Sequence, residues 1–131
     1  MADGDIGARE ERGLSQGRRR LGQVGERLAA LHYAQAGFEV VDTNWRCRQG
    51  ELDLVARKGS LVVFVEVKNR SSTAYGHPLE AVTAQKQQRL RRLAALWFQE
   101  HRRSGEQAHL EARFDVVAVL DGRLEVVTNA F

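Results

Sequence analysis

The chain has 131 residues, of which 43% are hydrophobic and 28% charged, and a formal net charge of +3. This length and composition predict one globular domain with a core of its own, and no apolar run approaches the ~18 residues that a membrane span needs. The N-terminal residues lack the apolar core of a secretory signal, and the single cysteine, Cys47, excludes an intramolecular disulfide, so we expect a cytoplasmic protein.

The first predicted element is a helix that begins near Leu21. Residues 1–20 are polar and of mixed charge, so we expect an N-terminal tail, followed by a single domain over residues 21–131. From Leu21 the apolar residues follow a helical period, and Gly37 is well placed to end the helix. The stripe predicted by this period consists of Leu21, Val24, Leu28, Leu31 and Gln35.

Three strands are predicted next. The first is "FEVVDTNWRCR", which either turns at residues 42–44 or continues past a bulge. Gly50 opens the second strand, "ELDLVA", and the turn "RKGS" joins it to "LVVFVEVKN" as an antiparallel hairpin. The third strand is apolar on both faces, which is typical of a buried central strand.

A long helix and a second hairpin complete the chain. The helix follows a loop that contains Pro78 and is expected to end near Arg103, with a stripe formed by Val82, Lys86, Leu90, Leu93 and Trp97. The two last strands are "RFDVVAVL" and "LEVVTNA", joined by the hairpin signal "DGR". The order αβββαββ predicts an α/β fold, a mixed β-sheet flanked by helices.

Charged residues interrupt the two central strands. Glu66 and Lys68 alternate with Val67 and therefore project to one side of their strand, and the short turn before them brings Asp53 of the neighbouring strand close. Two carboxylates in a largely apolar sheet repel each other, and each is costly to desolvate. A divalent cation would resolve the excess negative charge, and Lys68 could orient or deprotonate a water. In outline, this is a site for phosphodiester hydrolysis.

Structural explanations exist for the same residues. Asp53, Glu66 and Lys68 could form a salt network that ties two strands together. Lys86 lies within an apolar stripe, where it either extends its ammonium to solvent or reaches the acidic site or a bound phosphate. Trp45 could stack on an unpaired base, although a half-buried core position is the simpler interpretation.

The ordered segments "GELDLVA" and "FVEVKNR" resemble the PD-(D/E)xK nuclease superfamily, with Asp53 as its first acidic residue. A closer resemblance is to the YraN family of small bacterial proteins, themselves similar to archaeal Holliday junction resolvases. It rests on "GQVGERLAALHYAQAGFEVVDTNWRCRQGELDLVA", "FVEVKNRSSTAYGHPLEAVTAQKQQRL" and "RFDVVAV", and it covers about residues 22–120. Leu52 stands where the superfamily has a proline, and no ligand position is lost by this difference.

The resemblance implies a restriction-endonuclease-like fold and a metal-dependent endonuclease that hydrolyses phosphodiester bonds, with branched DNA as a candidate substrate. It implies Mg²⁺ or Mn²⁺ as the cofactor and a homodimer, because junction cutting normally needs two active sites. The catalytic residues would be Asp53, Glu66 and Lys68. The metal would be bound by Glu26, Asp53, Glu66 and Val67. The predicted nucleic-acid contacts are Arg46, Arg48, Arg70, Lys86 and Arg89.

Two other classes of function fit the sequence. One is a non-catalytic nucleic-acid-binding protein that retains a nuclease fold, which the mildly basic charge permits. The other is a structural or protein-interaction domain whose charges form a salt network. The first predicts salt-sensitive binding that survives Glu66→Ala, and the second predicts a large loss of stability in the same variant.

Overall fold

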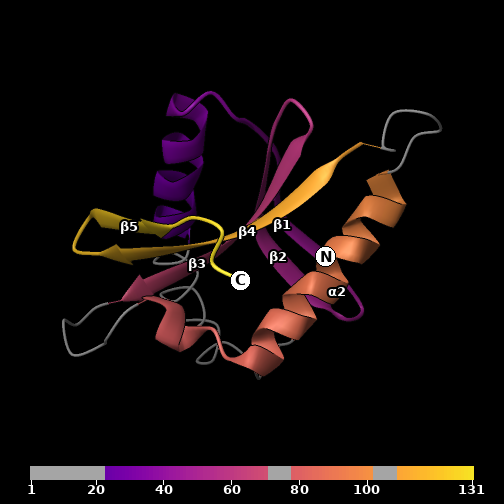
Figure 1. Cartoon of the computed structure of the whole chain (residues 1–131). Helices are drawn as coiled ribbons and strands as arrows, with labels where there is room; N and C mark the ends of the chain where they lie inside the picture. Colours follow the sequence, from indigo (N-terminus) through magenta and orange to yellow (C-terminus); the bar gives the residue numbers. More distant parts are fainter. Residues whose placement is uncertain (1–22, 71–77, 102–108) are drawn as a thin grey trace, which may run out of the picture.

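The structure is a computed structural model that describes residues 23–70, 78–101 and 109–131 (Figure 1). A first helix spans residues 23–35. The other elements are β1 (Glu39–Cys47), β2 (Gly50–Lys58), β3 (Leu61–Arg70), the 3₁₀ helix η2 (Pro78–Ala81), α2 (Ala84–His101), β4 (Glu111–Leu120) and β5 (Arg123–Val127).

The strands form one five-stranded sheet in the order β1-β2-β3-β4-β5. Neighbouring strands are antiparallel except β3 and β4, which are parallel because η2 and α2 lie between them as a crossover. The predicted α/β class, the mixed sheet and the order αβββαββ are confirmed. The arrangement is compatible with a restriction-endonuclease-like fold.

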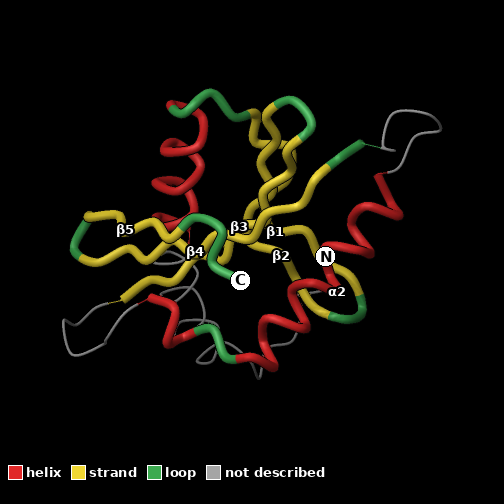
Figure 2. The backbone as a smooth tube through the Cα atoms, in the orientation of Figure 1, coloured by secondary structure: helices red, strands yellow, loops and turns green. Residues whose placement is uncertain are grey.

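The sheet separates two hydrophobic cores, with one helix on each face (Figure 2). On one face, Ala29 and Tyr33 of the first helix pack near strand residues such as Val63. On the other face, Leu93 and Trp97 of α2 belong to a core that contains Phe64. A strand covered on both faces must be apolar on both faces, which accounts for the composition of β3.

The predicted apolar stripe of the first helix is wrong. Val24 and Leu31 are 52% and 54% exposed, and Leu28 is half-buried. The buried positions of this helix are Gly25, Ala29 and Tyr33. Gly25 permits a close approach to β3, because a Cβ at this position would lie 2.5 Å from Oδ1 of Asn69. The small side chains, and not the aliphatic ones, therefore determine which face of this helix meets the sheet.

Local backbone geometry resolves the remaining expectations about the strands. β1 continues through residues 42–44 after a bulge between Val40 and Asp42, and Asn44 has a φ of 52°. The turn between β4 and β5 has positive φ at Asp121 and Gly122, as the "DGR" signal predicts. The second helix is described as far as His101, and its predicted end near Arg103 lies outside the described residues.

Parts of the predicted organisation lie outside the described residues. These are the N-terminal tail at residues 1–20 and most of the loop before Pro78. Within the residues that are described, no helix is long and apolar enough to cross a membrane.

Candidate functional site

The acidic residues lie where β2 and β3 cease to pair. The pairing of these strands extends from Lys58 opposite Leu61 to Leu54 opposite Val65. Asp53 and Glu66 are the next residues on the two strands. On its other side, β3 remains paired with β4 as far as Arg70. Glu66 therefore lies on a strand that is still paired with β4 but no longer with β2.

Asp53 is fixed at this point by a backbone hydrogen bond. The N–H of Val67 donates to Oδ2 of Asp53 over 2.9 Å. The carboxylate thus satisfies an N–H at the position where β2 no longer offers a backbone acceptor. This bond holds Asp53 beside Glu66, as the hairpin spacing predicts.

Two lysines approach the same oxygen of Glu66. Nζ of Lys68 lies 3.8 Å from Oε1 of Glu66, and Nζ of Lys86, from α2, lies 3.6 Å from it. The side chain of Glu66 is only 11% exposed. Lys86 therefore reaches the acidic site from within the apolar face of α2, which was one of the two alternatives for this residue.

The surroundings of Asp53 disfavour its ionised form. Burial, and next the negative charge of Glu66, raise the pKa of Asp53 to about 8. The hydrogen bond from Val67 acts in the opposite direction and is outweighed. A salt network built around Asp53 would lower its pKa, because a paired cation favours the charged form. The raised pKa instead shows that burial and the neighbouring Glu66 disfavour the ionised form of Asp53 more than the surrounding groups favour it.

The environment of Lys68 shifts its pKa downward. Burial is the main cause, and the neighbouring amine of Lys86 adds to it, whereas the carboxylate of Glu66 acts in the opposite direction. A lysine with a lowered pKa holds its proton less tightly near neutral pH. Such an amine is suited to accept a proton from a water or a hydroxyl group.

Glu26 lies on the first helix, where it contacts β1. Nδ2 of Asn44 donates to Oε2 of Glu26 over 2.8 Å. The charge of Glu26 is also one of the weaker causes that raise the pKa of Asp53, so the two groups sense each other. Asn44 was not among the predicted site residues, although an asparagine within a strand is a signal for a left-handed backbone position.

The donor set is suited to a hard divalent cation. In residues 23–70, 78–101 and 109–131, no three His, Cys, Asp or Glu side chains come close enough to hold a metal ion together. Asp53 and Glu66 interact directly, whereas Glu26 accepts a hydrogen bond from Asn44 and does not complete a group of three carboxylates among the described residues. Mg²⁺ is commonly bound by one or two carboxylates together with waters, so this pair fits such an ion.

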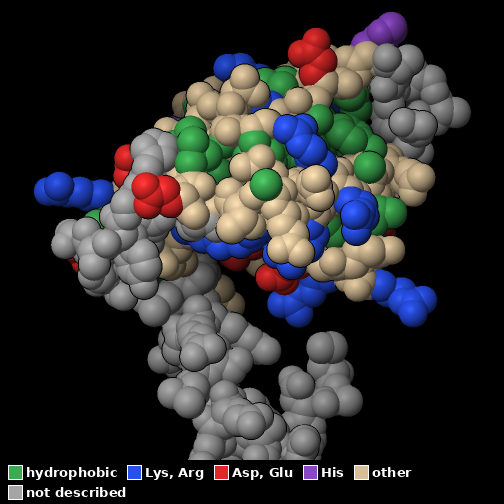
Figure 3. Space-filling view, turned by 60° about the horizontal axis from the view of Figure 1, so that its bottom comes forward, with side chains coloured by type: hydrophobic (Ala, Val, Ile, Leu, Met, Phe, Trp, Pro, Cys, Tyr) green, Lys and Arg blue, Asp and Glu red, His purple; other side chains and the backbone are tan. Residues whose placement is uncertain are grey.

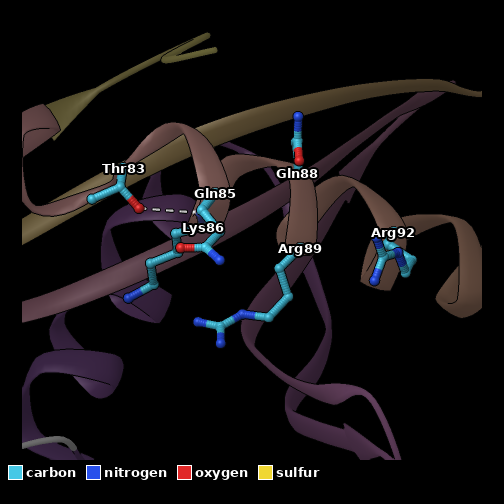
Figure 4. A pocket seen from close by; sticks show the side chains of 6 residues that line it. All are labelled: Thr83, Gln85, Lys86, Gln88, Arg89 and Arg92. Carbon is cyan, nitrogen blue, oxygen red and sulfur yellow. Dashed lines mark hydrogen bonds between the residues drawn. The ribbon is translucent and has the colours of Figure 1, made fainter.

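Four of the five predicted nucleic-acid contacts have side chains that the structure describes, and their surroundings differ. Arg46 pairs with Glu51 at 3.0 Å on the surface, and Arg48 is exposed. The side chain of Arg70 lies outside the described part of the chain. Lys86 and Arg89 both line a hollow beside α2 with a volume of about 510 Å³ (Figure 4).

Trp45 is half-buried against the core below α2. Its indole Nε1 donates to Glu100 of α2, and its ring packs with the same core as Phe64. These contacts favour the core position over a base-stacking role, because the ring and its N–H are both engaged within the protein.

Comparison with known proteins identifies the family. The family model described as "Uncharacterised protein family UPF0102" matches residues 25–119. A UPF0102 protein of Beutenbergia cavernae is 59% identical over 104 residues, covering 79% of this chain and 84% of the relative. One from Acidothermus cellulolyticus is 45% identical over 130 residues, covering 91% and 98%. The similarity to the YraN family that the sequence indicated is thereby confirmed, and the chain belongs to the protein family UPF0102.

Proposed function

We propose that this protein is a metal-dependent nuclease that hydrolyses phosphodiester bonds with Asp53, Glu66 and Lys68. The observation that carries the proposal is the pair of adjacent, buried carboxyl groups at the end of the β2–β3 pairing. Asp53 lies beside Glu66 and keeps a pKa of about 8 although two lysines are near. A divalent cation would offset the repulsion between the two carboxyl groups and favour the ionised form of Asp53, so the pair is suited to a metal site.

The carboxylates of Asp53 and Glu66 would hold Mg²⁺ or Mn²⁺, together with the backbone carbonyl of Val67. Oxygen donors of this kind are those that hard cations prefer. When bound, such an ion withdraws electron density from a phosphate oxygen and lowers the pKa of a water. The carboxylate of Glu26 accepts a hydrogen bond from Asn44, so Glu26 would attract the ion through its negative charge and would not coordinate it directly.

The lysines supply the proton transfer and part of the charge stabilisation. Lys68 has a lowered pKa and lies on the same strand face as Glu66, so its amine would take a proton from the attacking water. Lys86 approaches from α2, and its ammonium would stabilise negative charge that develops on the phosphate. Two amines with different surroundings thus divide the roles of base and cation.

DNA is the proposed substrate, with a branched form suggested by the similarity to resolvases. Arg46, Arg48 and Arg70 would contact its backbone. Cutting a junction symmetrically would require two copies of the chain.

The test is cleavage of labelled branched, flapped and linear DNA with Mg²⁺ or Mn²⁺. The wild type should cleave at least one of these substrates, and chelation of the metal should abolish cleavage. Glu66→Gln and Lys68→Met should lose cleavage. Glu125→Gln removes one exposed carboxylate from β5 and should retain it. Equal cleavage by wild type and Glu66→Gln would overturn the proposal.

The competing function is nucleic-acid binding without chemistry. The hollow beside α2, with its basic lining residues, supports nucleic-acid binding whether or not the protein also cleaves its ligand. In that case the wild type would bind DNA without cleaving it under any metal condition. Binding by Glu66→Gln would then be retained or strengthened, because the variant repels phosphate less.

A further inference from the structure

Three basic residues follow one another along α2, and the first of them, Lys86, lies at the acidic site. The hollow beside this helix is lined by Thr83, Gln85, Lys86, Gln88, Arg89 and Arg92. In Figure 4, Lys86, Arg89 and Arg92 extend to the same side of the helix, whereas Gln88 points away from them. We name these three cations the α2 track.

The α2 track is long enough to contact more than one phosphate of a nucleic-acid strand. Its members are three residues apart, so they follow one another along the helix at about 4.5 Å and span about 9 Å in all. Phosphates of one strand recur about every 3.4 Å along the axis of a duplex. Three cations at this spacing can therefore neutralise two or three successive phosphates of one strand.

The two arginines of the track differ from a third arginine of α2 in their contacts with the described residues. Among the described residues, Arg89 and Arg92 have no hydrogen-bond or ion-pair partner and are exposed. Arg91 of the same helix differs, because its guanidinium stacks on Phe114 at 5.2 Å and on Phe131 at 5.4 Å. An arginine in that position stabilises the core, whereas Arg89 and Arg92 remain available to an external anion.

The track connects directly to the site. Lys86 is its first member, and Nζ of Lys86 lies 3.6 Å from Oε1 of Glu66. Figure 3 shows the side of the molecule where α2 begins, with several separate groups of Lys and Arg side chains and with Asp and Glu side chains between some of them. A polyanion attracted to this side and seated on the track would reach Glu66 at one end.

We infer that the α2 track binds the phosphodiester backbone of a nucleic-acid strand and leads that strand to Glu66. The inference rests on the proposed function for its substrate class, and it adds Arg92 and a direction for the strand. Arg89 and Arg92 are binding residues, and Lys86 is shared between the track and the site.

The test is the salt dependence of binding, measured without divalent metal by fluorescence anisotropy on a labelled duplex and on its single strand. The double variant Arg89→Ala/Arg92→Ala should lose two phosphate contacts. The slope of log K against log salt should then become shallower by roughly 1.8 on the duplex or roughly 1.4 on the single strand. If only one of the two probes shows this change in slope, the α2 track binds that form of nucleic acid, duplex or single strand.

A charge-matched control is available on other surfaces. Arg57→Ala/Arg123→Ala also removes two positive charges, from β2 and from the edge strand β5, and should leave the slope unchanged. Circular dichroism should show that both double variants are folded. No binding by the wild type, or the same slope change in both double variants, would overturn the inference.

The outcome is separable from that of the proposed function. Binding without metal does not depend on cleavage, so a shallower slope together with absent cleavage would refute only the nuclease. Cleavage that requires Glu66, together with an unchanged slope in Arg89→Ala/Arg92→Ala, would refute only the track.

Discussion

The carboxylate of Asp53 accepts the backbone N–H of Val67, the residue that follows Glu66, over 2.9 Å. This bond crosses from β2 to β3 immediately beyond the last backbone pair of the two strands. It holds two acidic side chains together where repulsion alone would separate them. The geometry is stable, but the ionised state of Asp53 is not, as its pKa of about 8 shows.

Asp115 of β4 provides the contrasting case. It is 0% exposed, and it accepts hydrogen bonds from Tyr33 at 2.6 Å, from two nitrogens of Arg113 and from the backbone of Asn129. Burial and the contact with Asp115 raise the pKa of the Tyr33 hydroxyl well above its usual range. Here the donors satisfy the carboxylate completely, which is the arrangement expected of a structural group.

The first prediction separates these two roles. Asp115→Asn should lower the free energy of unfolding by about 3 kcal/mol, because Arg113 and Tyr33 would face an amide in place of a carboxylate. Urea unfolding measures this loss. The folded fraction should bind Mg²⁺ as the wild type does, and a selective loss of metal binding with unchanged stability would contradict the structural role.

The second prediction concerns stability and pH in the absence of metal. Between the ordinary value of 3.8 and about 8, folded Asp53 retains a proton that the unfolded chain has lost. The folded state then binds more protons, so the free energy of unfolding falls as pH rises through this window. Asp53→Asn keeps an oxygen acceptor for Val67 and should remove that part of the decline. Parallel stability curves for the variant and the wild type would argue against the raised pKa.

The third prediction concerns the two lysines. Lys86→Met removes one of the groups that lower the pKa of Lys68, so that pKa should rise toward its usual range. An NMR titration of the Lys68 side chain measures the shift. Lys58→Met is the control, since Lys58 bonds the carbonyl of Ala36 and should not affect Lys68. An unchanged Lys68 titration would show that the two amines do not interact.

The fourth prediction concerns the backbone of Asn44. Its φ of 52° lies in the left-handed region, which glycine and asparagine accept more readily than alanine. Asn44→Ala and Asn44→Gly both lose the hydrogen bond to Glu26, but only alanine adds backbone strain. Asn44→Ala should therefore be less stable than Asn44→Gly by about 1 kcal/mol in thermal or urea unfolding. Equal stabilities would show that the strand relaxes at this position.

The sequence was sufficient for the order of helices and strands along the chain but not for the packing of the first helix. Turn signals and a strand apolar on both faces define the hairpins and place β3 at the centre. Hydrophobic periodicity alone selected Val24 and Leu31, which are exposed, because it gives no weight to the small side chains of Gly25 and Ala29. The close approach that Gly25 allows depends on Asn69, more than forty residues away in the chain.

The site was predictable where local geometry determines it. Alternation along β3 places Glu66 and Lys68 together, the short turn brings Asp53 near, and a lysine within an apolar helical stripe identifies Lys86 as unusual. The contact between Asn44 and Glu26 was not predictable, because it joins separate elements through one unusual backbone angle. The bond between Tyr33 and Asp115 likewise links residues 82 positions apart.

The central claim is that Asp53 and Glu66 hold a divalent cation, and calorimetric titration of Mg²⁺ and Mn²⁺ tests it most directly. The wild type should bind the ion with release of a proton, because Asp53 must ionise. Glu66→Gln should show no measurable binding while its circular dichroism remains that of a folded protein, and Glu125→Gln should bind like the wild type. Binding by Glu66→Gln equal to that of the wild type, or no binding by a folded wild type, would contradict the account.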